Sequence, residues 1–245
     1  MNFLRALRRA ALSLAALPGR WTDRFYLAAD VPAPDLTTHT SFGDHLVEVA
    51  NRPGFRVLEI GSREVTGKSG LRARLDQAEY VGFDYYPGPN VDVAGDAHRL
   101  ASHVEGPFDA IYSSAVFEHL AMPWVAAEEI AKLLKVGGHL FIETHFAFSS
   151  HERPWHFFHF TDMGLRALFS PALGFECVEA SLQNPIVGRF SHHAAAYLRG
   201  QPVKGLYCHA SLIARKVRDV EGFDWRTADF GEIVGGTRYP PAAGR

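Results

Sequence analysis

The chain has 245 residues, of which 47% are hydrophobic, and this length and composition suit one domain with a substantial buried core. Its 25 basic and 27 acidic residues give a formal net charge of -2, so the overall charge does not favour a nucleic-acid partner. The two cysteines, Cys177 and Cys208, are too few for a disulfide framework. We therefore expect buried free thiols and a cytoplasmic protein.

Residues 1–17 place apolar side chains at helical spacing, with Arg5, Arg8 and Arg9 off the apolar stripe. The pattern predicts a basic amphipathic helix, ended by Pro18 and Gly19. Its charged start and short apolar run also resemble a signal peptide, but the run is too short to span a bilayer. We predict contact with a membrane surface or a membrane-bound partner, and docking on the chain's own domain is an equally good interpretation.

Short apolar runs alternate with helical patterns from residue 40 onward. Helices are expected over residues 40–51, 71–75, 123–134 and 161–169. Strands are expected over residues 57–60, 80–83, 91–94, 108–113, 139–144, 175–182 and 207–217. This alternation is typical of an α/β fold. Residues 183–205 form an insertion, and the glycine-rich residues 219–245 are expected to be loosely ordered.

The first expected strand ends in a turn at Gly61. We expect a ligand site at this turn. In open α/β sheets ligands bind beyond the carboxyl ends of the strands, and a glycine lets backbone N–H groups approach a polar ligand. Glu59 interrupts the apolar strand, and the amine of a cationic cofactor is one partner for such a buried carboxylate. Asp84 ends the second strand about 20 residues after Gly61, which is where an acid binds ribose hydroxyls in Rossmann-type sites. A loop aspartate without that role is the alternative.

Five segments in chain order resemble the class I S-adenosylmethionine-dependent methyltransferases, specifically the small-molecule group with a methyltransferase type 11 core. Together they lie within residues 55–148, and they are Val57-Leu-Glu-Ile-Gly61, Tyr80-Val-Gly-Phe-Asp84, Gly95-Asp-Ala-His98, Phe108-Asp-Ala-Ile-Tyr-Ser-Ser-Ala-Val-Phe-Glu-His-Leu120 and Leu133-Leu-Lys-Val-Gly-Gly-His-Leu-Phe-Ile142. The resemblance implies a Rossmann-like, doubly wound and mostly parallel sheet of seven strands, with helices on both faces and an antiparallel last strand. With the patterns at the two ends of the chain, we expect an N-terminal segment and linker (1–36), a methyltransferase domain (37–218) and a C-terminal tail (219–245).

By this resemblance the cofactor is S-adenosyl-L-methionine. Glu59 and Gly61 would contact its methionine part and Asp84 its ribose. The remaining predicted cofactor residues are Asp96 and Ala97 at the adenine, Ser113 and Ser114 at the floor near the sulfonium, and the flanking Ser62, Arg63 and Tyr85.

One departure concerns the glycine loop. The family commonly has further glycines two and four positions after the one matching Gly61, where this chain has Arg63 and Val65. The same absence disfavours NAD or FAD, whose glycine fingerprint serves pyrophosphate binding at a helix N-terminus.

Methyl transfer mainly requires alignment of the nucleophile and exclusion of water, and a base helps when the acceptor is a hydroxyl. A histidine suits this role near neutral pH. His119, after the fourth strand, is our first candidate, followed by His145 and then His156; a hydrogen-bonded loop histidine is the alternative for each.

The histidine- and aromatic-rich residues 145–160 are interpreted as a substrate lid, as core packing, or as a mixture of both. The spacing of His151, His156 and His159 fits no compact metal-ligand signature, so we predict no metal site.

The sequence thus predicts a methyltransferase acting on a small-molecule, glycan or lipid-linked acceptor, at oxygen rather than nitrogen or carbon. A scaffold protein that keeps the fold without catalysis is the alternative, motivated by the altered glycine loop. An NAD-dependent oxidoreductase is the third and least favoured interpretation. The sequence indicates no oligomeric state.

Overall fold

The computed structural model describes residues 22–65, 67 and 70–240. The amphipathic helix predicted over residues 1–17, with its predicted membrane contact, lies outside the described residues. None of the described helices is long and apolar enough to cross a membrane.

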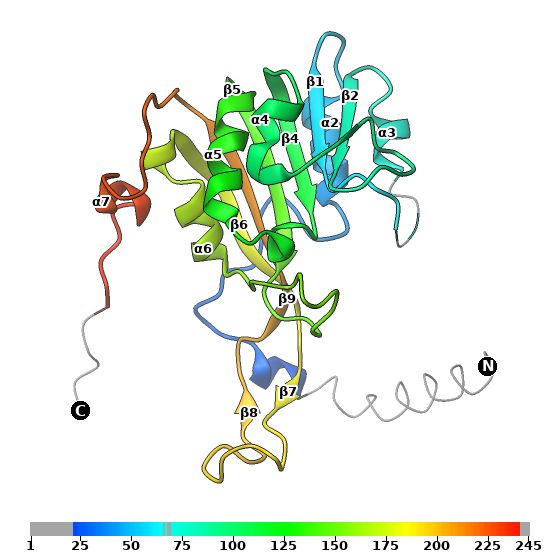
Figure 1. Cartoon of the computed structure of the whole chain (residues 1–245). Helices are drawn as coiled ribbons and strands as arrows, with labels where there is room; N and C mark the ends of the chain where they lie inside the picture. The colour runs from blue at the N-terminus through cyan, green and yellow to red at the C-terminus, as the bar shows by residue number, and fades with distance from the viewer. Residues whose placement is uncertain (1–21, 66, 68–69, 241–245) are drawn as a thin grey trace, which may run out of the picture.

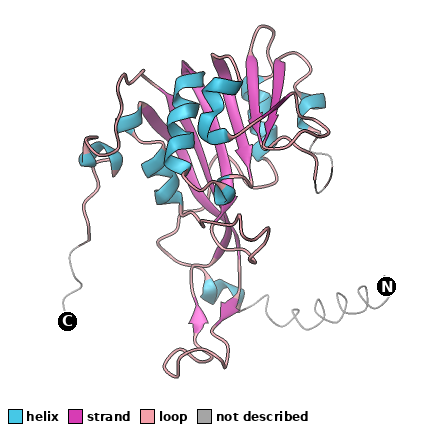
Figure 2. Ribbon diagram, viewed as in Figure 1, coloured by secondary structure: helices cyan, strands magenta, loops and turns pink. Residues whose placement is uncertain are grey.

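A seven-stranded sheet forms the centre of the molecule, with the strand order β3-β2-β1-β4-β5-β9-β6 (Figures 1 and 2). Neighbouring strands from β3 to β5 pair in parallel, and β9 runs antiparallel to both β5 and β6. The predicted Rossmann-like fold, with its antiparallel last strand, is therefore confirmed. The sheet strands are β1 (Arg56–Ile60), β2 (Glu79–Asp84), β3 (Val93–Ala94), β4 (Phe108–Ser114), β5 (Leu134–His145), β6 (Phe175–Pro185) and β9 (Tyr207–Lys216).

Helices cover both faces of the sheet. Leu100 of α4, Ile130 of α5 and Leu165 of α6 belong to one buried cluster, whereas Phe42 and Leu46 of α2 belong to a second cluster across the sheet. Figure 1 shows α4 and α5 in front of the strands and α2 behind them. The helices are α2 (Phe42–Ala50), α3 (Leu71–Arg74), α4 (Leu100–His103), α5 (Pro123–Leu133), α6 (Asp162–Leu168) and α7 (Phe230–Ile233), with short 3-10 helices η2 (Asp23–Tyr26), η3 (Ala97–Arg99), η4 (Phe117–His119) and η5 (Pro171–Leu173).

Strand β5 begins earlier than predicted. The chain passes from α5 directly into β5 at Leu134, and the predicted helix break at Gly137 instead lies inside the strand, at a φ of +88°. The β4–β5 register shifts between Leu134 and His139, so the extra residues bulge out of the ladder. The buried Lys216 ammonium satisfies the end of α5 by donating to the carbonyls of Ala131 (2.6 Å) and Leu134 (2.8 Å).

The predicted insertion carries a small hairpin of β7 (Gly188–Arg189) and β8 (Pro202–Val203), which projects from the lower end of the domain beside η2 (Figure 1). The backbone N–H of Gly205 donates to the Tyr26 carbonyl over 2.7 Å, which ties the hairpin to η2. This contact joins segments that are far apart in the sequence.

Residues before and after the sheet are also held against it. The Glu179 carboxylate on β6 accepts the backbone N–H groups of Asp35 (2.7 Å) and Leu36 (2.6 Å), so the predicted linker ends on the sheet. The predicted loosely ordered tail contains α7, and its Phe223 and Trp225 pack against the core. The two cysteines are free and half-buried, on β6 and β9.

Candidate active site

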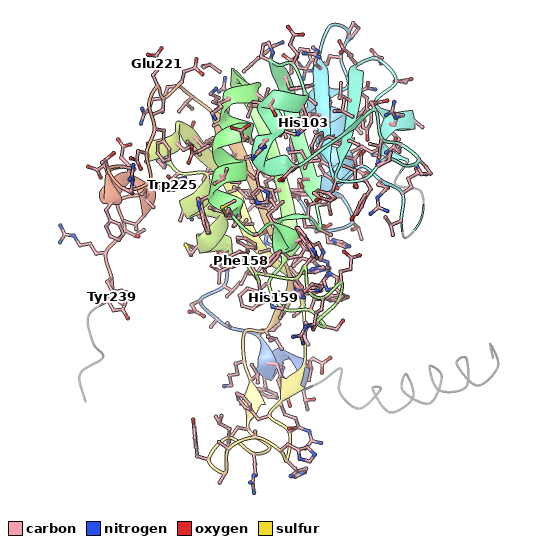
Figure 3. All side chains as sticks on the ribbon, in the orientation of Figure 1. His103, Phe158, His159, Glu221, Trp225 and Tyr239 are labelled. Atoms are coloured by element: carbon pink, nitrogen blue, oxygen red, sulfur yellow. The ribbon has the colours of Figure 1, made fainter. Side chains whose placement is uncertain are left out.

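A cavity of about 930 Å³ lies at the carboxyl ends of β1, β2, β4 and β5. Its wall combines the loop after β1, the ends of β2 and β4, the start of η3, and the loop that follows β5. Phe158 and His159, further along that loop, lie between the sheet and the projecting hairpin (Figure 3). The cavity therefore lies where ligands bind in open α/β sheets.

Gly61 makes the turn at the centre of this wall. Its φ is +85°, and a Cβ there would come within 2.2 Å of Val116 Cγ2, so a glycine is required on both counts. The N–H groups of Gly61 and Ser62 both donate to the Phe83 carbonyl, at 2.8 and 3.1 Å. They therefore bind β2 rather than a ligand, contrary to the expectation that backbone N–H groups of this turn approach one.

Glu59 presents a buried carboxylate to the cavity. It is 5% exposed, and it accepts the phenolic hydroxyl of Tyr80. Burial raises the pKa of Glu59, although the Tyr80 hydrogen bond opposes this. An ammonium group in the cavity would relieve the cost of the buried charge, so this site suits the amine of S-adenosylmethionine.

Asp84, at the end of β2, lines the same cavity and is held by Arg63. Arg63 Nε donates to Asp84 Oδ1 over 3.0 Å, and the Tyr86 N–H donates to the same oxygen over 3.1 Å. Arg63 stands where the family commonly has glycine, and here it fixes the carboxylate rather than opening the loop. The remaining carboxylate lone pairs can accept ribose hydroxyls.

Asp96 and Ala97 begin η3 and form the next part of the wall. Asp96 Oδ1 accepts from His98 through the backbone N–H (3.0 Å) and Nδ1 (2.6 Å). Burial raises the pKa of Asp96, but the hydrogen bonds from His98 outweigh it and hold the pKa below its usual value. The Asp96 carboxylate is therefore ionised and fixed in place.

The carboxyl end of β4 forms the floor of the cavity. Ser114 lines the cavity and donates to Glu143 Oε1 over 3.2 Å, whereas Ser113 is completely buried and is not among the lining residues. Ala115 follows with a φ of +54°, an uncommon conformation for a residue with a side chain. Apart from Ser113, the structure brings all the predicted cofactor residues to this one cavity: Glu59, Gly61, Ser62, Arg63, Asp84, Tyr85, Asp96, Ala97 and Ser114.

Two of the three predicted catalytic histidines line the far end of the cavity. His119 Nδ1 donates to the Trp155 carbonyl over 2.5 Å, which leaves Nε2 as the unprotonated nitrogen of the neutral ring. His145 lines the cavity with its ring stacked on Phe148, at a centroid distance of 4.5 Å. His156 is not a lining residue and instead packs on His151, 4.4 Å between ring centroids.

Sequence reasoning gave no role to Glu118, which is completely buried on η4. Its Oε2 accepts the Thr144 hydroxyl over 2.6 Å, and its Oε1 lies 2.7 Å from His145 Nδ1. The available signal was a carboxylate next to the apolar Val116 and Phe117, because a buried carboxylate needs a partner.

Residues 21–173 match the family model described as a methyltransferase domain. The chain belongs to this methyltransferase family. With the ordered motifs and the fold, this makes it a class I methyltransferase with S-adenosylmethionine as its cofactor.

One curated protein and two solved structures are similar to this methyltransferase. The ubiquinone biosynthesis O-methyltransferase of Caulobacter vibrioides is 33% identical over 102 residues, which are 42% of this chain and 37% of that protein. The chain thus matches well under half of that relative's length.

Among solved structures, the Burkholderia thailandensis 1,6-didemethyltoxoflavin-N1-methyltransferase, with bound 1,6-didemethyltoxoflavin and S-adenosylhomocysteine, is 16% identical with a TM-score of 0.52. The match covers 88% of this chain and 89% of that one. The [4+2]-cyclase SpnF is 19% identical with a TM-score of 0.51, over 78% of this chain and 89% of that one. At these identities the likeness shows the fold alone.

Proposed function

We propose that this methyltransferase transfers a methyl group to a hydroxyl oxygen of a small-molecule, glycan or lipid-linked acceptor. The observation that carries the proposal is a single cavity with two chemically different ends. One end presents the carboxylates of Glu59 and Asp84, and the other presents His119 and His145 beside aromatic rings. The name of the curated relative, an O-methyltransferase, supports oxygen as the accepting atom.

At the carboxylate end, Glu59 would bind the ammonium group of the cofactor and Asp84 its ribose hydroxyls. Asp96 and Ala97 would face the adenine. When bound, S-adenosylmethionine supplies a methyl carbon to which the acceptor oxygen forms a bond as the carbon–sulfur bond breaks and sulfur keeps the electron pair.

At the histidine end, His119 is the proposed general base. Its Nε2 is free to take the proton of the acceptor hydroxyl because Nδ1 is engaged by the Trp155 carbonyl. Glu152 Oε2 lies 3.6 Å from this Nε2, and Glu118 Oε1 lies 3.9 Å from it, so two carboxylates would stabilise the imidazolium that forms. Phe148 and Trp155 would hold the apolar part of the acceptor and exclude water.

Cofactor binding is tested by isothermal titration of the full chain with S-adenosylmethionine. Asp84→Asn should weaken binding about tenfold or more, since a lost charge-assisted hydrogen bond costs about 1.5–3 kcal/mol. Asp30→Asn makes the same chemical change at an exposed position and should bind as the wild type does. Equal affinities for the two variants would contradict the ribose role of Asp84.

The acceptor atom is tested with a panel of phenols, sugars and amines, and the products are identified by mass spectrometry and NMR. Methyl ethers are expected, and His119→Gln should lower kcat with little change in cofactor affinity. Products methylated only at nitrogen or carbon would overturn the choice of oxygen.

The alternative is a scaffold protein that keeps this fold without catalysis, and it is motivated by the altered glycine loop, in which Arg63 pairs with Asp84. Cofactor binding without formation of S-adenosylhomocysteine across the acceptor panel would support that alternative.

A further inference from the structure

A buried carboxylate and a buried imidazole face each other beside the proposed acceptor end of the cavity. Glu118 is 0% exposed and His145 is 8% exposed. Glu118 Oε1 and His145 Nδ1 lie 2.7 Å apart, at the distance of an ion pair. Their orientation does not satisfy hydrogen-bond geometry, and neither atom makes a hydrogen bond to another group in the described part of the chain. Buried polar atoms without a well-formed hydrogen bond are uncommon, and one ligand bound to both atoms would satisfy them.

A third donor completes the cluster. Donor atoms of Glu118, His145 and His151 all lie within 4.8 Å of one another. His151 Nδ1 donates to the Ser149 carbonyl over 2.9 Å, which leaves its Nε2 lone pair available. Neighbouring ligands of a tetrahedral ion with bonds of about 2.0–2.2 Å lie about 3.3–3.6 Å apart. Glu118 Oε1 and His145 Nδ1, which are 2.7 Å apart, would therefore have to separate by less than about 1 Å to bind one ion.

Glu118 and His151 also make the kind of hydrogen bonds that orient metal ligands, through the atoms that would face away from the ion. The Thr144 hydroxyl holds the second oxygen of Glu118, and the Ser149 carbonyl fixes the tautomer of His151. A backbone or hydroxyl partner on the far side of a ligand is the usual outer contact of a metal site. Stacking on Phe148 further fixes the ring of His145.

We propose that Glu118, His145 and His151 bind one divalent first-row transition-metal ion. Two imidazoles and one carboxylate are the donors of catalytic zinc sites that keep an open position. His145 and His151 line the cavity, so the open position faces the proposed acceptor end. The spacing of the histidines in the sequence gave no such site because its carboxylate comes from η4, outside the histidine-rich loop.

The role of the ion rests on the proposed function. An acceptor hydroxyl bound at the open position would lose its proton more readily, since a metal ion lowers the pKa of a bound O–H group. The O–H bond breaks, its proton passes to His119 Nε2, and the electron pair stays on the oxygen that is then methylated. His119 and the ion would thus act on the same hydroxyl.

A second cluster, made of His39, Glu143 and His209, offers an internal comparison. Both clusters contain a His–Glu ion pair, but in this one the pair also has hydrogen-bond geometry, from His39 Nδ1 to Glu143 Oε2 over 3.0 Å, and His209 Nδ1 bonds to Asn184 Nδ2 over 3.0 Å. We therefore place the ion at Glu118 and not at Glu143.

The test uses the full chain, freed of metal by a chelator, and titrates it with Co²⁺ and Zn²⁺ in the absence of cofactor and acceptor. Wild type should bind one ion per chain and show the visible Co²⁺ absorption of a nitrogen- and oxygen-ligated site. His151→Ala and Glu118→Gln should each weaken binding at least tenfold, and the exposed His192→Ala should not. Circular dichroism confirms folding, and His151, on a loop, keeps the test informative if Glu118→Gln does not fold.

Absence of metal binding to wild type would overturn the proposal. So would binding that survives His151→Ala and Glu118→Gln but is lost in His39→Ala. Because no cofactor is present, failure here is distinct from failure of the methyltransferase proposal, which the S-adenosylmethionine titration tests separately.

Discussion

Replacing Gly61 with alanine should destabilise the protein through two separable effects. The first is conformational: a φ of +85° costs a residue with a Cβ about 1–2 kcal/mol. The second is steric, because the new Cβ would lie 2.2 Å from Val116 Cγ2, whereas carbon atoms in contact prefer about 3.5–4.0 Å. Overpacking of this kind costs about 1–3 kcal/mol, so the total loss should be about 2–5 kcal/mol.

Gly54 provides the matched control, since its φ is +80° and nothing lies within 4 Å of its added Cβ. Gly54→Ala should therefore show the conformational cost alone, and both changes affect the unfolded chain alike. The free energy of unfolding is measured in urea for both variants and for Gly61→Ala combined with Val116→Ala. The second substitution should recover most of the difference between Gly61→Ala and Gly54→Ala. If the two single variants differ by less than about 0.5 kcal/mol, the predicted crowding at the cavity wall is refuted.

Three further changes test the energetics of buried charge. Lys216→Met removes the ammonium that holds the end of α5 and should lower the free energy of unfolding by about 1.5–3 kcal/mol in urea; a loss below about 0.5 kcal/mol would argue against the cap. Burial, together with the charges of His39 and His145, lowers the pKa of His209 to about 4, so the unfolded chain binds the extra proton as the pH falls from about 6.5. Stability should therefore fall between about pH 6.5 and pH 4, and less steeply in His209→Gln, as followed by urea unfolding at several pH values; parallel profiles would contradict this. Burial raises the pKa of Glu59, so its contribution to stability is present at low pH and lost as the pH rises through the folded-state pKa. At pH 7 Glu59→Gln should raise the melting temperature of the ligand-free protein while weakening S-adenosylmethionine binding. A lower melting temperature would show that burying the charged Glu59 carboxylate does not destabilise the protein.

The parts of the fold set by local patterns could be predicted from the sequence. Short apolar runs mark the strands because parallel strands are buried on both faces. The early start of β5 could not be predicted in this way, since Gly137 and Gly138 are typical of a helix end, and the Lys216 side chain that caps α5 comes from the distant strand β9. Nor does the composition of residues 219–240 show that Phe223 and Trp225 find a place on the core.

Strand alternation explains why only one of the two predicted floor residues, Ser114, lines the cavity. Successive side chains on a strand point to opposite faces, and Tyr112 and Ser114 line the cavity while the intervening Ser113 does not. The period of two could therefore have excluded Ser113 before the structure was known. In contrast, the position of His151 depends on the path of an irregular loop, for which the sequence has no period to read.

The proposed acceptor end of the cavity was harder to predict because its residues come from separate strand ends. Ser114 pairs with Glu143 at the ends of β4 and β5, so the residues that follow these strands meet. That register brings Glu118 against Thr144 and His145. The rule that carboxyl ends of parallel strands share one edge of a sheet places His119 and His145 near this edge, but it does not show that the Glu118 side chain turns toward them.

The altered glycine loop has a physical explanation in the charge of the cofactor. A pyrophosphate needs free backbone N–H groups, but here the N–H groups of Gly61 and Ser62 are engaged by the Phe83 carbonyl. The cavity instead offers the carboxylates of Glu59 and Asp96, which would repel a phosphate and attract the ammonium and sulfonium charges of S-adenosylmethionine. A loop that recognises its ligand through acidic side chains does not need further glycines. Arg63 can therefore occupy a glycine position, where its side chain holds the carboxylate of Asp84, the proposed ribose ligand.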